Sequence, residues 1–367
     1  MTNVNKKLEQ SYVVICFFDA YPPTTGSGAV CYDFFKAIKS KKKLFLQYST
    51  KNIKKKDVKS INIIKNNFFF KIIFLPIIYF FLLDFLRKQN SNRNVIIEGP
   101  SWAFYSFFLI FFLRFFIDTK LIYRSHSIEW EIRKRNSNLL IAYLTKFFEK
   151  KICQLSDIVT SVSVVEQKKF IKYYSKKTYL FPNSISFNSL NKIKSSRPSN
   201  VPKKFIFYCG SYNYGPNRSA INILINKIMP RLSSDIKLVL TGDCNLDFCN
   251  PRVLNYGIID KSYLKFLYNN CIAIVAPIFE GYGTRIKFIE ALFYNCLIIT
   301  TNKGFEGLDV SSKNVVTVNS IELMIKKIKE IKEIKKIKKG KKSLFYLQKF
   351  SMEKNTTKFI KFLNDRR

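Results

Sequence analysis

Short apolar runs alternate with segments of helical periodicity along most of the chain. In the first half, the runs that predict strands are SYVVICFF, KLFLQYS, NVIIEG, KLIYRSH, DIVTSVS and TYLFPNS (residues 11–18, 43–49, 94–99, 120–126, 157–163 and 178–184). In the second half they are KFIFYCG, IKLVLTG, RVLNYG, CIAIVAP and CLIITT (204–210, 236–242, 252–257, 271–277 and 296–301). Such alternation is typical of parallel sheets covered by helices on both faces. The pattern predicts an α/β protein with two doubly wound parallel sheets.

A polar segment separates the two halves. Residues 187–201 are rich in Ser, Asn, Lys and Pro and lack apolar periodicity, as expected for a linker. We therefore predict a first domain at 1–186, a linker at 187–201 and a second domain at 202–344. Residues 345–367 are helical in pattern and form a separate C-terminal element.

Two apolar segments resemble membrane spans, Phe68 to Leu86 and Trp102 to Ile117. The first contains Lys71, Pro76 and Asp84, and the second is shorter than the roughly 20 residues that a span requires. Buried or interfacial helices fit both better. Because they are rich in phenylalanine and lie beside basic segments, peripheral contact with an anionic membrane is a further hypothesis.

The composition is strongly basic, with a formal charge of +38 over 367 residues. Such an excess attracts nucleic acid or acidic lipid. The lysines are spread along the chain and lack a base-reading signature, so we predict no nucleic-acid partner. Eight cysteines include no C-x-x-C pair, and several lie in apolar runs. This usage favours a reduced, cytoplasmic protein. Together with the membrane hypothesis above, it predicts a location at the inner face of the cytoplasmic membrane.

The most informative stretch runs from Ala273 to Leu292. A short buried strand ends at Pro277, a loop with Gly281 and Gly283 follows, and helical periodicity begins near Thr284, a candidate N-cap. A helix N-terminus that follows a glycine loop at a strand end attracts anions, because free N–H groups and the helix dipole point into the loop.

Two cations occupy this helix start, Arg285 and Lys287. Positive charge there is unfavourable for the helix itself, and an external polyanion such as a diphosphate would remove the conflict. Glu290 lies three residues after Lys287 and could accept hydrogen bonds from ribose hydroxyls. The alternative is an ordinary solvated Lys287–Glu290 pair. Spacing alone does not separate the two interpretations.

The pattern P-x-x-E-G-x-G-T-R-x-K-x-x-E-A, followed by LIITT and KGFEGL, resembles the donor site of the GT-B retaining glycosyltransferases, the "group 1" (family 4) set. The resemblance implies diphosphate contacts from Arg285 and Lys287 and a ribose contact from Glu290. It also implicates the loop residues Glu280, Gly281, Gly283 and Thr284 in donor binding. Family members commonly place two glutamates closer together than Glu280 and Glu290, so the role of Glu280 is open.

A second segment of the same half, SYNYGPN, resembles the family's G-x-x-x-y-x-P-N motif. It implies that Gly210 and Asn217 meet the donor. Many members carry an arginine directly after the first glycine. Ser211 stands there in this chain, so the positive charge is expected from Arg218 together with Arg285 and Lys287.

The first half contributes two candidates. The stretch PPTTGSG predicts a turn after the first strand and a helix from Ala29 to Ile38, and its Gly26 and Gly28 form a possible acceptor-side loop. His126, the only histidine, follows a predicted parallel strand, where ligand crevices lie. The segment RSHSIE resembles the family's R-x-H-N-x-E, which implies that His126 lies near the transferred sugar and that Glu129 positions the loop.

The resemblance implies a GT-B fold with two Rossmann-like domains facing a central cleft, and a C-terminal helix at residues 345–367 that packs back on the first domain. It also implies a metal-independent, retaining transfer from a nucleotide-diphosphate sugar to a glycan or lipid-linked acceptor in surface polysaccharide or glycolipid synthesis. The catalytic set would be His126, Arg285 and Lys287, and no cofactor or D-x-D metal motif is expected. Two alternatives are a non-catalytic membrane-surface scaffold and another Rossmann-like nucleotide-sugar enzyme, although the dinucleotide fingerprint is missing.

Overall fold

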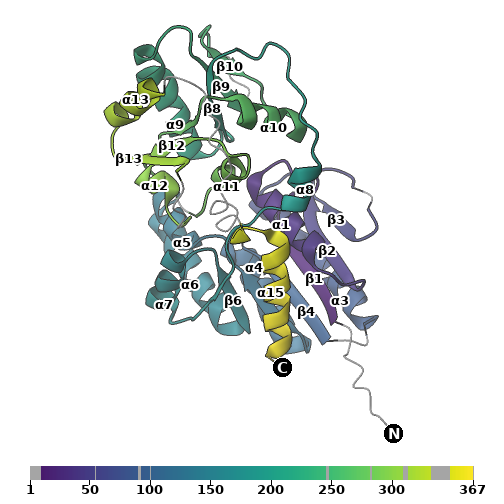
Figure 1. Cartoon of the computed structure of the whole chain (residues 1–367). Coiled ribbons are helices and arrows are strands. Elements are labelled where there is room, and N and C mark those ends of the chain that lie inside the picture. Colours follow the sequence, from purple (N-terminus) through teal and green to yellow (C-terminus); the bar gives the residue numbers. More distant parts are fainter. Residues whose placement is uncertain are drawn as a thin grey trace. The chain divides into compact units, whose positions relative to one another are not determined.

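The structure is a computed structural model that describes residues 10–53, 55–89, 92–99, 101–244, 248–281, 283–308, 313–331 and 348–366. The chain divides into two compact units, shown in Figure 1. Unit 1 contains Met1–Asn183 and Asn355–Arg367, and unit 2 contains Ser184–Lys354.

Unit 1 is built on a seven-stranded sheet with the order β3-β2-β1-β4-β5-β6-β7. All of its neighbouring strands are parallel. The strands are β1 (Gln10–Cys16), β2 (Lys43–Ser49), β3 (Val58–Asn62), β4 (Asn92–Glu98), β5 (Lys120–Arg124), β6 (Ile158–Ser161) and β7 (Tyr179–Leu180). Strand order reverses between β1 and β4, so the loops that follow these two strands flank a topological switch point, where open α/β sheets bind ligands.

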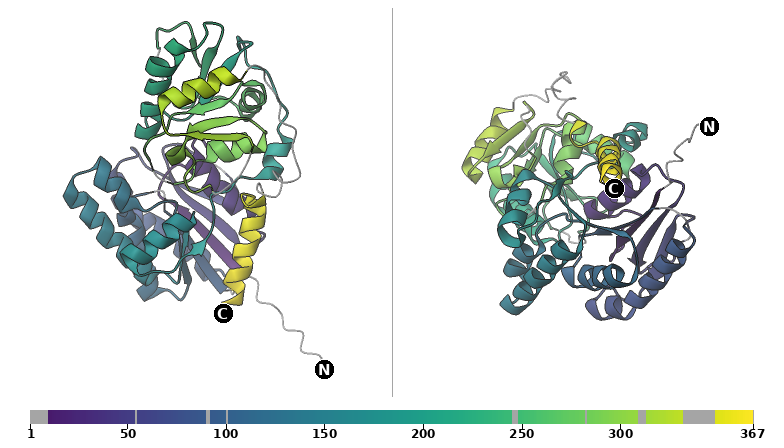
Figure 2. Two further views of the ribbon diagram at one scale, coloured as in Figure 1. Left: turned by 60° about the vertical axis from the view of Figure 1, so that its left-hand side comes forward. Right: turned by 90° about the horizontal axis from the view of Figure 1, so that it is seen from below.

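Helices cover the sheet of unit 1. They are α1 (Gly26–Ala37), α2 (Phe68–Ile73), α3 (Leu75–Arg87), α4 (Ala103–Phe116), α5 (Glu129–Asn136), α6 (Leu139–Leu155), α7 (Val164–Tyr174) and α15 (Met352–Asp365). Buried residues of α3, α4, α6 and α7 form one core cluster with the strands. Figure 2 shows the blue helices α3 and α4 side by side along the sheet.

Unit 2 has a six-stranded parallel sheet with the order β10-β9-β8-β11-β12-β13. Its strands are β8 (Phe205–Cys209), β9 (Lys237–Thr241), β10 (Val253–Asn255), β11 (Ile274–Ala276), β12 (Ile298–Thr301) and β13 (Val315–Val318). Its helices are α8 (Phe187–Lys192), α9 (Gly215–Ile223), α10 (Lys261–Asn270), α11 (Ile286–Phe293), α12 (Asn302–Phe305) and α13 (Ile321–Glu330), with a π-helical turn η1 (Leu224–Ile228) and a 3-10 turn η2 (Met229–Arg231). Here the switch point lies between β8 and β11.

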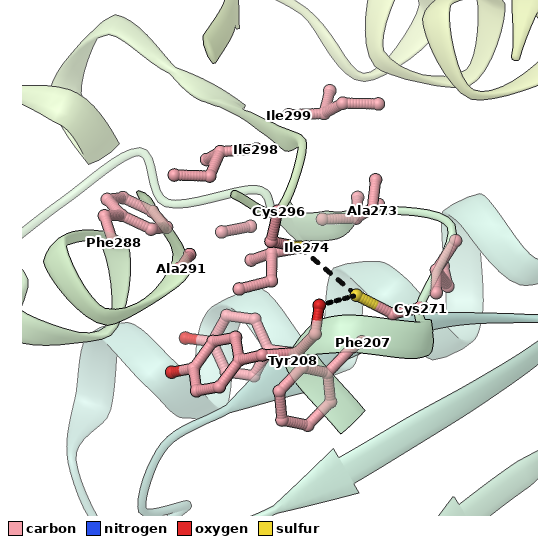
Figure 3. Packing of buried hydrophobic residues seen from close by; sticks show 14 of the residues in the cluster. Phe207, Tyr208, Cys271, Ala273, Ile274, Phe288, Ala291, Cys296, Ile298 and Ile299 are labelled. Carbon is pink, nitrogen blue, oxygen red and sulfur yellow. Dashed lines mark hydrogen bonds between the residues drawn. The ribbon is translucent and has the colours of Figure 1, made fainter. Parts of the chain in front are cut away.

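The sheet of unit 2 packs against its helices through wholly buried side chains. Phe207 and Ile274 on the strands belong to one buried cluster with Phe288 and Ala291 on α11 (Figure 3). Two free thiols take part in this core, with the sulfur atoms of Cys271 and Cys296 3.3 Å apart. This packing fixes α11 against the strand that precedes it, and thereby fixes the loop between them.

The two parallel sheets confirm the predicted α/β class, and every predicted strand contains an observed one. Two strands were not predicted, β3 and β13. Both are edge strands with exposed positions, so they lack the continuous apolar run of a buried parallel strand.

The start of α1 differs from the prediction. The helix begins at Gly26 rather than at Ala29, because the side chain of Thr25 accepts a hydrogen bond from the backbone N–H of Gly28 and caps the helix. Gly26 and Gly28 therefore lie in the first helical turn. A Cβ at Gly28 would lie 3.1 Å from the carbonyl oxygen of Ala20, so the absence of a side chain lets α1 approach the loop after β1 closely.

The segment predicted as a linker contains a short helix. Ser186 caps α8, which occupies residues 187–192, and Leu190 of this helix is buried. The division between the units falls at residues 183 and 184, a few residues before the expected linker. The expected boundary between 344 and 345 lies outside the described residues.

Helix α15 packs on unit 1 through aromatic side chains. Phe359 is fully buried, and its ring lies 5.0 to 6.3 Å from the rings of Phe34, Tyr179 and Phe181. Lys120 also donates hydrogen bonds from Nζ to the carbonyl oxygens of Leu363 and Arg366. The last helix of the chain therefore completes the core of the first unit.

Among the described residues, Phe68–Arg87 is long and apolar enough to cross a membrane, with a mean hydropathy of 2.2. Helix α4 is apolar but shorter. In the structure the first segment is divided into α2 and α3, and Ile78, Leu82 and Leu86 of α3 are buried in the core of unit 1. Length and composition alone are weak evidence for a span, and this helix contributes to a folded domain.

We expect Phe359→Ala to lower the free energy of unfolding of unit 1 by about 3–5 kcal/mol, because it deletes a fully buried ring whose neighbours cannot all close the cavity. Chemical denaturation would measure the change. Lys358→Ala, one position earlier and exposed, is the matched control and should be nearly neutral. Equal stability of both variants would show that α15 contributes little to this core.

Candidate functional site

The loop between β11 and α11 has the positive-φ backbone at its glycines that the sequence predicts. Gly281 and Gly283 have φ values of +111° and +72°, a region that residues with a side chain rarely adopt. A Cβ at Gly281 would lie 3.1 Å from the guanidinium of Arg285. Arg285 folds back over the loop and donates from Nη1 to the carbonyl oxygen of Gly283 (2.8 Å) and from Nη2 to that of Glu280 (3.4 Å). The loop therefore holds this cation in place.

The start of α11 corrects one prediction. Arg285, not Thr284, occupies the N-cap position, and no side chain caps the helix. Thr284 lies one residue too early, and its Oγ1 is buried without a hydrogen-bond partner among the described residues. The first N–H groups of α11 and this hydroxyl are thus available to an external acceptor.

Lys287 lies in the first turn of α11 and reaches the strand and helix on the other side of the switch point. Its Nζ donates to Oδ1 of Asn217 (3.1 Å) and lies 3.9 Å from the centre of the Tyr208 ring. Tyr208 donates its hydroxyl to the same Oδ1 (2.7 Å), and Nδ2 of Asn217 donates to the carbonyl oxygen of Ser211 (3.0 Å). Tyr208, Asn217 and Lys287 are therefore one connected group.

Gly210 makes this group possible. A Cβ at this position would lie 2.7 Å from Nδ2 of Asn217, closer than real Cβ contacts allow. The structure thus brings together Gly210, Asn217 and Lys287, which the sequence suggested through separate motifs. Tyr208 was not predicted, because a tyrosine inside an apolar strand looks like an ordinary core residue.

Burial lowers the pKa of Lys287 to about 8, and the nearby positive charge of Arg285 acts in the same direction. Burial also lowers the pKa of Arg285. Among the described residues, neither side chain has a carboxylate within ion-pair distance. Two partly desolvated cations are the main electrostatic feature of this site.

Glu290 lies one turn further along α11. Its Oε2 accepts a hydrogen bond from the hydroxyl of the buried Tyr268 (3.0 Å), another residue that the sequence did not single out. The same hydroxyl lies 3.4 Å from the carbonyl oxygen of Lys287. Tyr268 therefore orients the carboxylate relative to the first turn of the helix.

Two predicted donor residues lie away from this group. Glu280 is exposed, and its carboxylate accepts a hydrogen bond from Ser219 of α9 (3.1 Å). The side chain of Arg218 is exposed on the same helix. Arg285 and Lys287 are thus the cations that the loop and helix hold in place.

Unit 1 has its own polar cluster at the switch point. His126, after β5, has its Nε2 2.6 Å from Oε2 of Glu98, at the end of β4. Glu98 is buried and also pairs with Arg124, whose Nε lies 2.9 Å away. The Arg124 guanidinium lies 4.0 Å from the centre of the Phe34 ring. Neither Glu98 nor Arg124 was predicted as a site residue, because a charge inside an apolar run gives no indication of its partner.

Electrostatics in this cluster favour a protonated histidine. Burial disfavours the imidazolium, but interactions with Cys31 and with the Glu98 carboxylate raise the pKa of His126 above its ordinary value. The pKa of Glu98 is lowered even though burial raises it, because Arg124 and His126 both stabilise the carboxylate. Glu98 therefore acts as the anion that fixes the ring of His126.

Cys31, Glu98 and His126 offer ligand atoms within 4.8 Å of one another, a spacing that a metal ion could accept. However, Glu98 already binds the cation of Arg124, and a metal ion would bring a second positive charge into contact with it. A hydrogen-bonded ion network explains the arrangement better.

Glu129 has a structural position, in agreement with its expected role. Its Oε2 accepts from the backbone N–H of Ala103 at the start of α4 (2.5 Å), and its Oε1 from Arg133 (3.0 Å). Glu149, which was not predicted, accepts from the N–H groups of Glu129 and Trp130 and from the hydroxyl of Tyr174. These carboxylates tie α4, α5 and α6 together beside the His126 loop.

Comparison with known proteins gives a family match for unit 2. Residues 203–333 match the family "Glycosyl transferases group 1", a region that contains every feature of the glycine-loop site. The chain has no match among curated proteins.

Solved structures match over nearly the whole length. A sucrose-phosphate synthase from Thermosynechococcus elongatus has a TM-score of 0.72 at 14% identity, covering 97% of this chain and 98% of its own. Anabaena HepE in complex with UDP and glucose has a TM-score of 0.68 at 13% identity, with 96% and 98% covered. The lipopolysaccharide outer core galactosyltransferase WaaB has a TM-score of 0.59 at 13% identity, with 96% and 99% covered. These likenesses confirm the GT-B fold.

We expect Lys287→Met to raise the free energy of unfolding at pH 7 by about 1–2 kcal/mol, because it removes a charge whose folded-state pKa is depressed. Below pH 8 the unfolded chain accommodates the ammonium better than the folded chain, and this penalty disappears as pH rises from about 8 to the unfolded value of 10.5. The advantage of the variant should therefore shrink by pH 10. Denaturant titrations at both pH values would measure it, and a variant less stable than wild type at pH 7 would contradict this account.

His126 gives a second test, because it is the only histidine and its ring resonances can be assigned directly. We expect an NMR titration to give a pKa above 6.5 in the wild type and a clearly lower value in Glu98→Gln. Glu131→Gln, which removes the partner of Lys169 instead, should leave the titration unchanged. A wild-type pKa below 6.5 would contradict the assignment without any variant.

Proposed function

We propose that this chain, which has a GT-B fold and carries a group 1 glycosyltransferase domain at residues 203–333, transfers a sugar from a nucleoside-diphosphate sugar to a glycan or lipid-linked acceptor. The observation that carries the proposal is the pair of partly desolvated cations, Arg285 and Lys287, at a glycine loop and helix start with no carboxylate within ion-pair distance among the described residues. A diphosphate is the ligand that balances them.

The site offers the interactions that such a transfer needs. As the bond between sugar and diphosphate breaks, negative charge grows on the leaving phosphate. Arg285, Lys287 and the free N–H groups of α11 stabilise that charge without reorganising. Glu290, oriented by Tyr268, accepts hydrogen bonds from the ribose hydroxyls of the nucleotide. Gly281 and Gly283 let the backbone approach the phosphates.

In this proposal, residues of unit 1 bind the transferred sugar and the acceptor. His126, held by Glu98, orients the transferred sugar through its remaining ring nitrogen. The N-terminal turn of α1, with Gly26 and Gly28, is the proposed acceptor-side loop. We further propose that the reaction retains the configuration of the sugar and proceeds without a metal ion, since the glycine-loop cations supply the charge that a metal ion would otherwise provide.

Names of similar proteins guide the choice of substrates. HepE was solved with UDP and glucose, and WaaB is a galactosyltransferase of the lipopolysaccharide outer core. For this chain we propose UDP-hexoses as the first donors to test and lipid-linked glycans as the first acceptors. We also propose a cytoplasmic location at the inner face of the membrane, where such acceptors are assembled.

The direct test is a product assay with a panel of nucleotide sugars and lipid-linked acceptors. We expect Lys287→Ala and Glu290→Gln to lower kcat/KM by about 100-fold or more, because each removes a group that contacts the donor. Lys227→Ala, exposed on η1 of the same unit, is the control and should keep full activity. Wild-type activity in both site variants would break the assignment.

A thermal-shift scan separates an enzyme from a scaffold on the same fold. A nucleotide sugar that binds the folded state raises the unfolding midpoint in proportion to the logarithm of its concentration. We expect stabilisation by at least one UDP- or GDP-sugar, and its loss in Lys287→Ala. No stabilisation by any nucleotide sugar would favour the scaffold.

A further inference from the structure

Unit 1 exposes an apolar surface on the outer sides of α2, α3, α4 and α6. Of the twenty-two large apolar side chains exposed in the described chain, fifteen lie between residues 64 and 147, and we call these fifteen the outer apolar surface. Phe69, Phe80, Phe115, Phe116, Leu140 and Tyr143 are each more than 60% exposed. Water-soluble domains usually place charged residues on the outer faces of such helices.

Ring contacts make this surface continuous across three helices. The ring of Phe68 on α2 lies 5.4 Å from that of Phe104 on α4, and Phe104 lies 5.2 Å from Phe148 on α6. Phe148 in turn contacts the exposed Phe147. Along α4, the ring centres of Phe111 and Phe115 lie 4.9 Å apart, with the rings tilted relative to each other. The exposed side chains therefore form one area rather than isolated points.

The inner faces of the same helices are committed to the core. Leu82 of α3, Leu109 and Leu113 of α4 and Ile152 of α6 are buried against the sheet. Helix α2 is also tied to the sheet, because the hydroxyl of Tyr48 on β2 donates to the carbonyl oxygen of Lys71 on α2 (2.7 Å). Moving Phe68–Arg87 into a bilayer as a span would expose this core, so the segment fits a helix that lies on a membrane rather than crossing it.

Cations border the apolar surface. Arg87, Lys88, Arg114 and Lys150 are exposed on α3, α4 and α6, and Lys134 and Arg135 are exposed on the neighbouring α5. Among the glutamates of α5 and α6, Glu129 and Glu149 are buried and Glu131 is paired with Lys169. Apolar side chains flanked by long basic ones match an interface with acyl chains beneath anionic headgroups.

We propose that the outer apolar surface docks unit 1 onto an anionic lipid bilayer, with the helices lying in the plane of the interface. The occupant is lipid rather than a protein partner, because exposed cations outnumber exposed acidic residues beside the surface, where Asp84 and Asp157 pair with Lys88 and Arg114, and the chain as a whole carries +38. The argument uses unit 1 alone and does not depend on the proposed reaction.

The test is co-sedimentation of the full chain with vesicles of phosphatidylcholine, with and without about 30% phosphatidylserine. We expect binding to the anionic vesicles at low salt, and a drop of about fivefold or more in the partition coefficient at 0.5 M salt. The double variant Phe115→Glu and Leu140→Glu should lower it about tenfold or more. These side chains are largely exposed, so the variant should fold, and an unchanged thermal unfolding midpoint would confirm that it does.

The matched control is Ile258→Glu, which places the same charge on an equally exposed apolar residue of unit 2 and should leave binding unchanged. No binding of wild type to anionic vesicles at low salt would overturn the proposal, as would binding that the double variant does not weaken. Sedimentation velocity tests the alternative that a second copy of the chain covers the surface. A wild-type dimer that the double variant dissociates, together with no vesicle binding, would support that alternative and overturn the lipid proposal.

Discussion

The site in unit 2 depends on keeping the ammonium of Lys287 charged although it is buried and no carboxylate of the described residues lies within ion-pair distance. Three effects oppose the charge: desolvation, the nearby cation of Arg285 and the positive end of α11. Two weaker ones support it, the neutral oxygen of Asn217 and the ring of Tyr208. The balance lowers the pKa to about 8, so the group is still protonated near neutral pH. An anion would interact with it more strongly here than at an exposed lysine, because the low local dielectric reduces screening.

Placing Lys287 and Arg285 in this site depends on glycines that lie far apart in the sequence. Asn217 can accept from both Tyr208 and Lys287 only because Gly210 leaves space beside its amide. The loop can hold Arg285 only because Gly281 and Gly283 take positive φ. Each glycine thus permits a close approach that places a charge, and the parallel order of β8 and β11 brings both loops to one sheet edge.

The sequence predicted those features that depend on a short contiguous segment, such as buried strands and the glycine loop. Buried parallel strands appear as continuous apolar runs, so both sheets were found except for the edge strands β3 and β13. Helix starts were predicted less well: the cap expected at Thr284 is not formed, and Thr25, which was not singled out, caps α1. Glu98, Arg124, Tyr208 and Tyr268 were not found, because their importance arises from partners on other strands and helices. The glycine loop and its cations were found because one contiguous segment contains them all.

The phenylalanine-rich helices show where composition by itself is ambiguous. A segment such as AFYSFFLIFFLRFF is apolar all round, which fits a buried helix and an interfacial helix equally well. In the structure one face of α4 is buried, since Leu109 and Leu113 lie in the core. Phe115 and Phe116 lie on its exposed face. Exposed apolar area costs about 25 cal/mol per Å² in water. No described residue of unit 1 covers these side chains, whereas a lipid interface would, and the surrounding basic residues would bind its headgroups. The high positive charge and the exposed rings are therefore complementary features of one surface.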